Sequence, residues 1–176
     1  MNKSLSALAI ASITLLAASG AQAEAVRTER NMSLELASRI ATAAVAACQD
    51  KGYAVTTTVV DRAGTVRAVL RADNAGPHTV DASRAKAYTS ASAKNTTLAM
   101  MENAQKNPAA ATLVYLPGML LVGGGVPVKV GNEVIGAVGI GGAPGGHLDE
   151  QCAVAALDKV AAVSYTHLTL PTSDLV

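Results

Sequence analysis

Four side chains outside the C-terminal tail could bind a ligand or a metal ion: His78, Arg84, Lys86 and His147. His78 follows Pro77 where a loop is expected to meet a helix, a placement that suits a metal-binding imidazole and also an ordinary solvated histidine. Arg84 and Lys86 lie on that helix, where their charges suit a carboxylate ligand, a solvated helix face or an intersubunit salt bridge. His147 begins the last expected helix. Its position there suits a ligand-binding residue and also an ordinary surface residue. We therefore take all four as candidate cofactor-binding residues and His78 as the candidate metal ligand.

Other chemical patterns are weaker. No nucleophile-elbow pattern supports a Ser–His–Asp triad, and the absence of a recognised catalytic constellation favours a binding protein over an enzyme. Asp149 and Glu150 are adjacent on an expected helix and point about 100° apart, so they complement the helix N-terminus rather than face one substrate. The run GGAPGG at residues 141–146 joins a strand to a helix but lacks a Gly-Lys-Ser/Thr element, so it predicts tight turns rather than a nucleotide site.

Cys48 and Cys152 are the two cysteines of the chain, and each falls in an expected helix. The sequence leaves two alternatives open. They form a disulfide, which an oxidising compartment allows, or they are two buried thiols that act as small apolar side chains. No Cys or His lies at ligand spacing from either, so we expect no metal site there.

Hydrophobic periodicity and turn signals predict the elements that must position these residues. Ser33 caps the first expected helix, and Gly131-Asn132 joins two expected strands as a hairpin turn. The order α-ββ-αα-βββ-α uses hairpins rather than βαβ crossovers, which predicts an α+β domain with a five-stranded antiparallel sheet flanked by helices. Residues 108–118 are expected to be irregular. The expected helices span residues 33–51, 79–94, 96–106 and 148–162, and the expected strands span residues 54–61, 65–72, 119–122, 126–130 and 133–140.

The two ends of the chain have a different character from the domain. A basic start with Lys3, an apolar stretch and the small-x-small sequence AQA at residues 21–23 predict a cleaved signal peptide over residues 1–23. The apolar stretch is shorter than the roughly 20 residues of a membrane span. We therefore expect a periplasmic or secreted domain over residues 24–162. Residues 163–176 have no helical or strand period and are interpreted as a doubtful, non-native tail.

Composition excludes two classes of partner. The chain has 14 basic and 13 acidic residues, and loss of Lys3 with the signal leaves 13 of each. A neutral protein has no general attraction to nucleic acid or to an anionic membrane. With no Trp, no Phe and four Tyr, base-stacking platforms are not expected. A core of small aliphatic side chains buries little area, which points to homo-oligomerisation.

Several collinear motifs resemble the GlcG/HbpS family, of the DUF336 type. They cover nearly all of residues 31–162, and we identify them as VVDRAG (59–64), DASRAKAYT (81–89), GGVPV (124–128), GNEVIGAVGI (131–140) and GAPGG (142–146). The resemblance implies a profilin-like or roadblock-like α/β/α sandwich, homo-oligomers that are often octamers, and haem as a cofactor. Haem iron is held by side chains that include His, which directs attention to His78.

Two function classes follow. The first is an exported haem-binding protein that captures or senses haem, with His78 as the iron ligand and Arg84 or Lys86 near the propionates. The alternative is an oligomeric enzyme or ligand-binding accessory protein acting on a small organic acid, with Arg84 or Lys86 as the carboxylate anchor.

Overall fold

The computed structural model describes residues 26–167, with side chains of the last helix described to residue 162. The signal peptide expected over residues 1–23, and residues 168–176 of the doubtful tail, lie outside the described residues. The last helix continues to His167, five residues beyond its expected end. Within the described part of the chain, no helix has both the length and the apolar character needed to cross a membrane.

The element order matches the expected one except for one missing strand and two additional short helical segments. Ser33 is the N-cap of the first helix, and its side chain accepts a hydrogen bond from the backbone N–H of Leu36. Residues 108–118, expected to be irregular, contain a helical turn and a 3₁₀ turn. The elements are α1 (Leu34–Gln49), β1 (Thr56–Asp61), β2 (Val66–Arg71), α2 (His78–Ala93), α3 (Thr97–Lys106), α4 (Pro108–Ala111), η1 (Thr112–Tyr115), β3 (Gly125–Val130), β4 (Glu133–Gly141) and α5 (Gly146–His167).

All neighbouring strands of the sheet are antiparallel, and their order is β2-β1-β4-β3. The two hairpins are therefore joined through the central pair β1 and β4, where Val59 lies opposite Val138. The expected hairpin at Gly131-Asn132 is confirmed, because Val130 pairs with Glu133 across that turn. The α+β class with an antiparallel sheet is confirmed.

The prediction of a fifth strand at residues 119–122 is wrong, since the described sheet has four strands. The backbone N–H of Leu120 donates to the hydroxyl of Thr89 on α2 at 2.8 Å, instead of to a neighbouring strand. Further along, a Cβ on Gly123 would lie 2.9 Å from the backbone of Gly146, at the start of α5. The segment is apolar because it runs against helices. Apolar character alone does not distinguish a segment packed against helices from a strand in a sheet.

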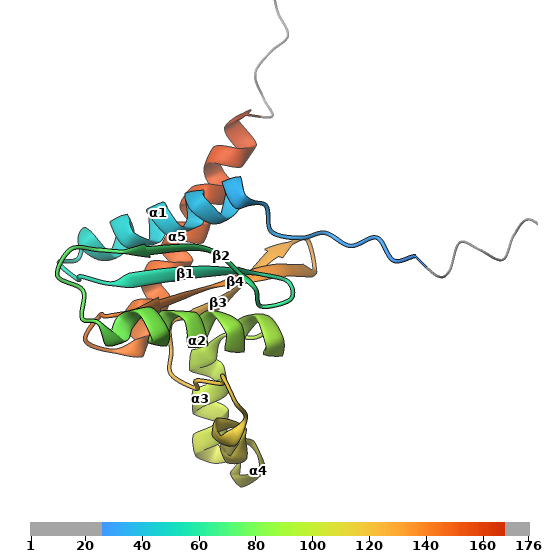
Figure 1. Ribbon diagram of the computed structural model, residues 1–176, viewed down its shortest axis with the longest axis vertical. Helices are drawn as coiled ribbons and strands as arrows, with labels where there is room; N and C mark the ends of the chain where they lie inside the picture. Colours follow the sequence, from blue (N-terminus) through green and yellow to red (C-terminus); the bar gives the residue numbers. More distant parts are fainter. Residues whose placement is uncertain (1–25, 168–176) are drawn as a thin grey trace, which may run out of the picture.

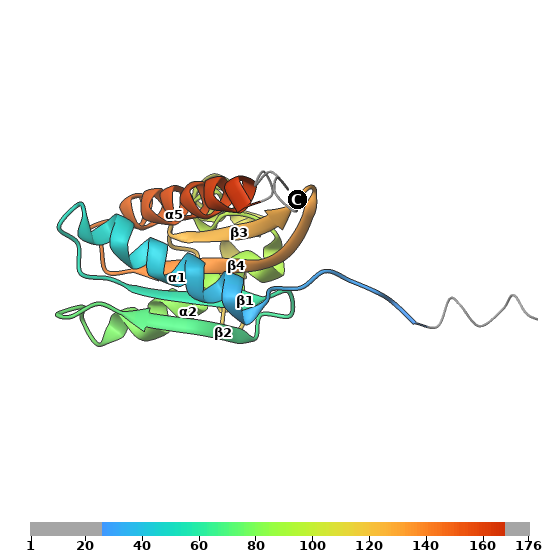
Figure 2. The same ribbon diagram turned by 90° about the horizontal axis from the view of Figure 1, so that it is seen from above.

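Helices cover both faces of the sheet. Helices α1 and α5 lie on one face and α2 lies on the other (Figures 1 and 2). The main apolar core fills the space under α1 and α5, where the fully buried side chains include Ile40, Val59, Val138 and Ile140. We call this side the α1/α5 face and the opposite side the α2 face.

The α2 face combines buried polar groups with a small apolar cluster formed by Val60, Ala87, Ala91 and Ala137. The hydroxyl of Thr56 is hydrogen-bonded to that of Thr79 at 2.6 Å, and that of Thr58 to Ser83 at 2.8 Å. All four residues are buried. Alternate residues of β1 point to opposite faces, so this strand supplies hydroxyls to α2 while Val59 enters the apolar core on the other side.

The helices of the α1/α5 face are also linked covalently. Cys48, at the end of α1, and Cys152, in the second turn of α5, form a disulfide with their Cα atoms 5.4 Å apart. Of the two alternatives that the sequence leaves open, the structure shows the disulfide. Both residues are completely buried within the core cluster.

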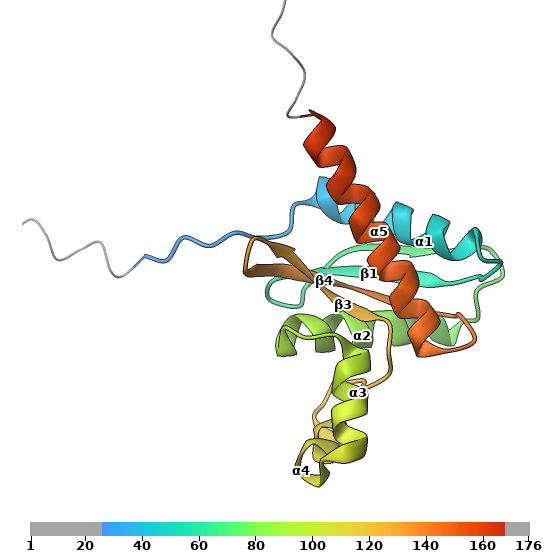
Figure 3. The ribbon, with the colours of Figure 1, turned by 180° about the vertical axis from the view of Figure 1, so that it is seen from behind.

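A segment that we call the arm, residues 97–118, projects from the sandwich beyond the α2 face. It consists of α3, α4 and η1, and Figure 3 shows it extending away from the sheet. Its far end exposes three consecutive large apolar side chains, Val114, Tyr115 and Leu116, of which Tyr115 is 83% exposed. The arm thus places apolar surface in solvent, away from the core.

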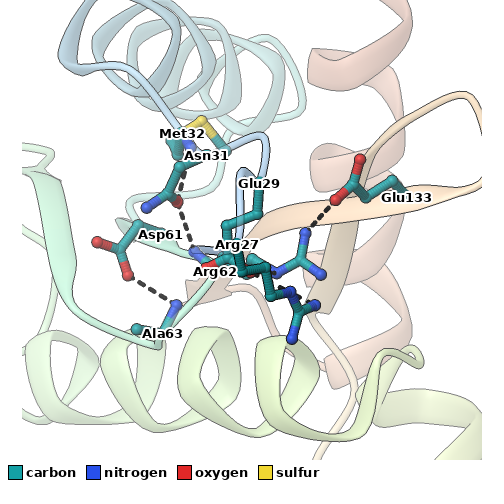
Figure 4. A network of polar contacts seen from close by, with 8 residues as sticks. All are labelled: Arg27, Glu29, Asn31, Met32, Asp61, Arg62, Ala63 and Glu133. Carbon is teal, nitrogen blue, oxygen red and sulfur yellow. Dashed lines mark hydrogen bonds and ion pairs between the residues drawn. The ribbon is translucent and has the colours of Figure 1, made fainter. Parts of the chain in front are cut away.

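The segment before α1 is held by polar contacts against the β1–β2 turn, which an ion pair links to the β3–β4 turn (Figure 4). The guanidinium of Arg62 forms ion pairs with Glu29 and with Glu133, which follows the β3–β4 turn. The side chain of Asn31 accepts a hydrogen bond from the backbone N–H of Arg62. Asp61 accepts hydrogen bonds from two N–H groups of its own turn, which is the turn role expected from its position in the sequence.

Candidate functional site

The two candidate histidines, His78 and His147, have the same local geometry. Each stands two residues after a glycine, His78 after Gly76 and His147 after Gly145, and each is exposed at the start of a helix. A Cβ on Gly76 would lie 2.9 Å from Nδ1 of His78, and a Cβ on Gly145 would lie 3.0 Å from Nδ1 of His147. The corresponding distances to Nε2 are 3.8 and 3.9 Å. In both cases the glycine makes room for the imidazole, and Nε2 is the nitrogen farther from the backbone.

The surroundings of the two rings differ. His147 lines an open groove of about 410 Å³ that lies between α5, α3 and the residues after α1. The groove has an apolar part formed by Leu98, Val154 and Ala155, and a polar part formed by His147, Lys51, Glu150, Gln151 and Asp158. A second groove, of about 400 Å³, lies between α1 and α5. Neither of these two grooves includes His78 in its lining.

Polar side chains of the first groove also connect the elements that form it. The carboxylate of Glu150 accepts a hydrogen bond from the backbone N–H of Leu98, near the start of α3, at 3.3 Å. The ammonium of Lys51 donates to the side chain of Gln151 at 3.4 Å. These bonds hold the start of α3 and the residues after α1 beside α5. The groove is therefore made from three parts of the sequence.

Arg84 and Lys86, which the sequence places together on one helix, face different environments. Arg84 is exposed on α2. The side chain of Lys86 is only 4% exposed, and its ammonium donates to the carboxylate of Asp149 at 2.8 Å and to the backbone oxygen of Ile140 at 2.9 Å. The Lys86 ammonium is therefore bound inside the protein rather than presented to a ligand on the surface.

The Lys86–Asp149 ion pair joins α2 to the start of α5. Its carboxylate is 3% exposed and also accepts a hydrogen bond from the backbone N–H of Ala143, in the glycine-rich connector. Burial raises the pKa of the Asp149 carboxyl above its usual value, and the charge of Lys86 opposes that rise. A Cβ on Gly124 would lie 3.1 Å from the Lys86 ammonium, so a glycine there leaves space for the pair.

The sequence contains a signal for this buried pair. Thr79, Ser83, Ala87 and Ser90 recur at helical spacing on α2 and are all buried, and Lys86 lies on the same stripe. Because most of the stripe is hydroxylated, it does not stand out as a buried face by hydrophobicity. Asp149 indeed lies in the first turn of α5, as expected, but its principal partner is Lys86.

Comparison with known proteins assigns the domain. The family model of haem-degrading HbpS-like proteins matches residues 32–158. The chain belongs to the HbpS-like family. The match covers the whole sandwich and the arm, from just before α1 to within α5, so the HbpS-like domain includes the groove, both histidines and the buried ion pair.

Relatives of this HbpS-like chain agree in sequence and in fold. Protein GlcG of Escherichia coli K12 is 33% identical over 115 residues, which are 65% of this chain and 84% of GlcG. A double mutant of Streptomyces reticuli HbpS, solved by crystallography, is 34% identical with a TM-score of 0.73, covering 83% of this chain and 98% of that one. The PduOC protein, solved as a haem complex, is 23% identical with a TM-score of 0.65, covering 73% of this chain and 94% of that one, and shows the shared fold alone. The expected GlcG/HbpS membership is confirmed.

Proposed function

We propose that this protein binds haem outside the cytoplasm, to capture or to sense it. The observation that carries the proposal is the match of nearly the whole domain to the family of haem-degrading HbpS-like proteins. PduOC, which has the same fold, was crystallised with haem. The described residues contain no group of three or more His, Cys, Asp or Glu side chains suited to a bare metal ion. The proposal therefore concerns haem iron, which is bound mainly by its porphyrin and needs few ligands from the protein, rather than a bare metal ion.

The side chains of the chain fit such a group. Haem requires an axial nitrogen, sulfur or oxygen ligand, apolar contact for its ring and charged groups for its propionates. Exposed imidazoles stand at the starts of two helices, and the groove between α3 and α5 adds apolar surface at Leu98 and Val154 and a cation at Lys51. The groove volume lies within the range of small-molecule sites. When bound, haem would supply an iron centre that these side chains would hold.

The disulfide supports a location outside the cytoplasm. Disulfides form and persist in oxidising compartments and are rare in the cytosol. The Cys48–Cys152 bridge is buried in the core, so it has a structural rather than a transient role. It agrees with the signal peptide expected over residues 1–23. Mass spectrometry of the protein isolated from the periplasm or medium tests this part, because cleavage after Ala23 gives a chain that begins with Glu24.

Exposed apolar surface supports homo-oligomerisation, with the octamer as the expected assembly. Strand β2 is an edge strand and exposes Val66, Val69 and Leu70 by 40% or more. The tip of the arm exposes a second apolar group. Exposed apolar side chains on an unpaired strand edge are typical of interaction sites. Sedimentation of the purified protein gives the number of subunits, and a monomer at micromolar concentration would contradict this part of the proposal.

The structure of the protein reduces the support for the alternative function, in which the ligand is a small organic acid. That alternative used Arg84 or Lys86 as the carboxylate anchor, and the ammonium of Lys86 is already bound by Asp149 and Ile140 in the interior. We therefore put forward haem binding alone.

The test is a haemin titration of the purified full chain, followed by absorbance in the Soret region. Saturable binding with a defined stoichiometry and a shifted Soret band is expected. A weak, non-saturating spectral change would overturn the proposal.

A further inference from the structure

The chain contains two histidines with the same local backbone setting and different neighbours. Both rings lie over a glycine two residues earlier, and both have Nε2 as the outer nitrogen. Either could bind a metal as far as its own geometry is concerned. What surrounds each ring therefore decides which of them has a site.

An axial ligand by itself holds a haem weakly, because most of the contact area of the macrocycle is apolar and must be removed from water. His147 has apolar side chains beside it in one groove. Val154 lies seven residues further along α5, two helical turns away on the same side, and Leu98 approaches from the start of α3. Neither groove described above extends to His78, which begins α2 on the opposite face of the sheet.

Charge in the groove is mixed, and its arrangement bears on the ligand. Lys51 provides a cation suited to a propionate. Glu150 and Asp158 are acidic, but the Glu150 carboxylate already accepts the Leu98 backbone N–H. The groove thus joins an imidazole, apolar side chains and a cation along one helix and its two neighbours.

We propose that His147, through Nε2, is the iron ligand of this protein, and that the groove of Leu98 and Val154 contacts the macrocycle. The inference rests on the proposed haem binding and names its site. It replaces His78, the residue that the sequence favoured, by a residue with the same local geometry and a groove beside it.

The experiment compares the haemin titration of the wild-type full chain with that of His147→Gly, with His78→Gly as the matched control. Both histidines are exposed, so both variants are expected to keep the fold, which circular dichroism and thermal unfolding without haemin verify. Loss of the iron ligand is expected to weaken haemin binding by about tenfold or more. It is also expected to change the iron spin state in electron paramagnetic resonance. The His78→Gly variant is expected to stay within about twofold of the wild type.

Two further measurements separate a ligand from a residue that only shapes the groove. Free imidazole added to His147→Gly is expected to restore the wild-type spin state, because it can occupy the position of the lost ring. Val154→Glu places a charge in the apolar part of the groove and leaves His147 unchanged, so it is expected to weaken binding while the spectrum of the bound form stays that of the wild type.

The outcomes are distinguishable. If the wild type does not bind haemin saturably, the proposed function fails and this inference with it. If the wild type binds and His147→Gly has the same affinity and spectrum, the inference alone is overturned. It is also overturned if His78→Gly is the variant that loses affinity and changes spin state.

Discussion

The two faces of the sheet are stabilised in different ways. On the α1/α5 face, aliphatic side chains pack around a disulfide, and burial has little directional requirement. On the α2 face, Thr–Thr and Thr–Ser hydrogen bonds join α2 to the sheet, the Lys86–Asp149 ion pair joins it to the start of α5, and each contact demands one geometry. Strand β1 contributes to both faces, because its successive residues alternate between them. The comparison suggests that the α1/α5 face supplies most of the stability and that the α2 face fixes the register of α2.

The largest effect is expected from opening the disulfide. The double variant Cys48→Ala/Cys152→Ala removes a bridge between residues separated by 104 positions. For a loop of this length the chain-entropy estimate is about 4–5 kcal/mol of unfolding free energy. Urea unfolding measures it, with the reduced wild type as a control that should lose a similar amount. A loss below about 1 kcal/mol would show that apolar packing alone holds α1 against α5.

The next largest effect is expected on the α2 face from Lys86→Met, which leaves the Asp149 carboxylate buried without its ion-pair partner. Breaking a buried pair in this way costs about 3–5 kcal/mol of unfolding free energy. The double variant Lys86→Met/Asp149→Leu removes both charges and is expected to recover most of that loss. Arg84→Met, two residues earlier and exposed, is the control and should change stability by less than about 0.5 kcal/mol. Equal losses in the single and double variants would contradict the role of the charges.

A smaller effect is expected for the hydroxyl pairs. Ser83→Ala removes the hydrogen-bond partner of the buried Thr58 hydroxyl, which should cost about 1–2 kcal/mol of unfolding free energy. Adding Thr58→Val removes the unpaired group and should return the stability close to that of the wild type. A double-mutant cycle measured by thermal unfolding gives the coupling energy between these two side chains. A coupling near zero would mean that the two hydroxyls do not help to position α2.

The smallest effect is expected on the apolar face and has the opposite sign. Thr57 lies next to Thr58 in β1 and points to the α1/α5 face, opposite Ile140, and its buried hydroxyl oxygen has no hydrogen-bond partner among the described residues. Thr57→Val is expected to raise the unfolding free energy by about 1 kcal/mol, since an unsatisfied buried hydroxyl is destabilising. Calorimetry of this variant beside Thr58→Val would contradict the comparison if the two changes had the same effect.

Local signals in the sequence predicted much of the fold. The cap at Ser33 and the turn at Gly131-Asn132 each depend on a few adjacent residues, and both were found where they were expected. The segment at residues 119–122 was wrongly predicted as a strand because an apolar run against helices resembles one in an edge strand. The disulfide could not be decided, because it depends on whether α1 and α5 touch.

The candidate site was predictable only in part. The motifs identified the family, and residue type identified both histidines. The groove beside His147 brings together Lys51, Leu98 and Val154, which are far apart in the sequence, so no spacing rule could find it. Lys86 was predicted to bind a ligand because the sequence shows that the residue is charged but does not show that its side chain is buried.

The position of the disulfide has a consequence for the integrity of the chain. Cys48 and Cys152 lie on either side of the arm in the sequence, so a protease that cuts once among residues 107–118 leaves two fragments still covalently joined. Such a nicked molecule would migrate as one species on a gel without reductant and separate into two when the bridge is reduced. Damage at the exposed end of the arm therefore need not release either half of the sandwich.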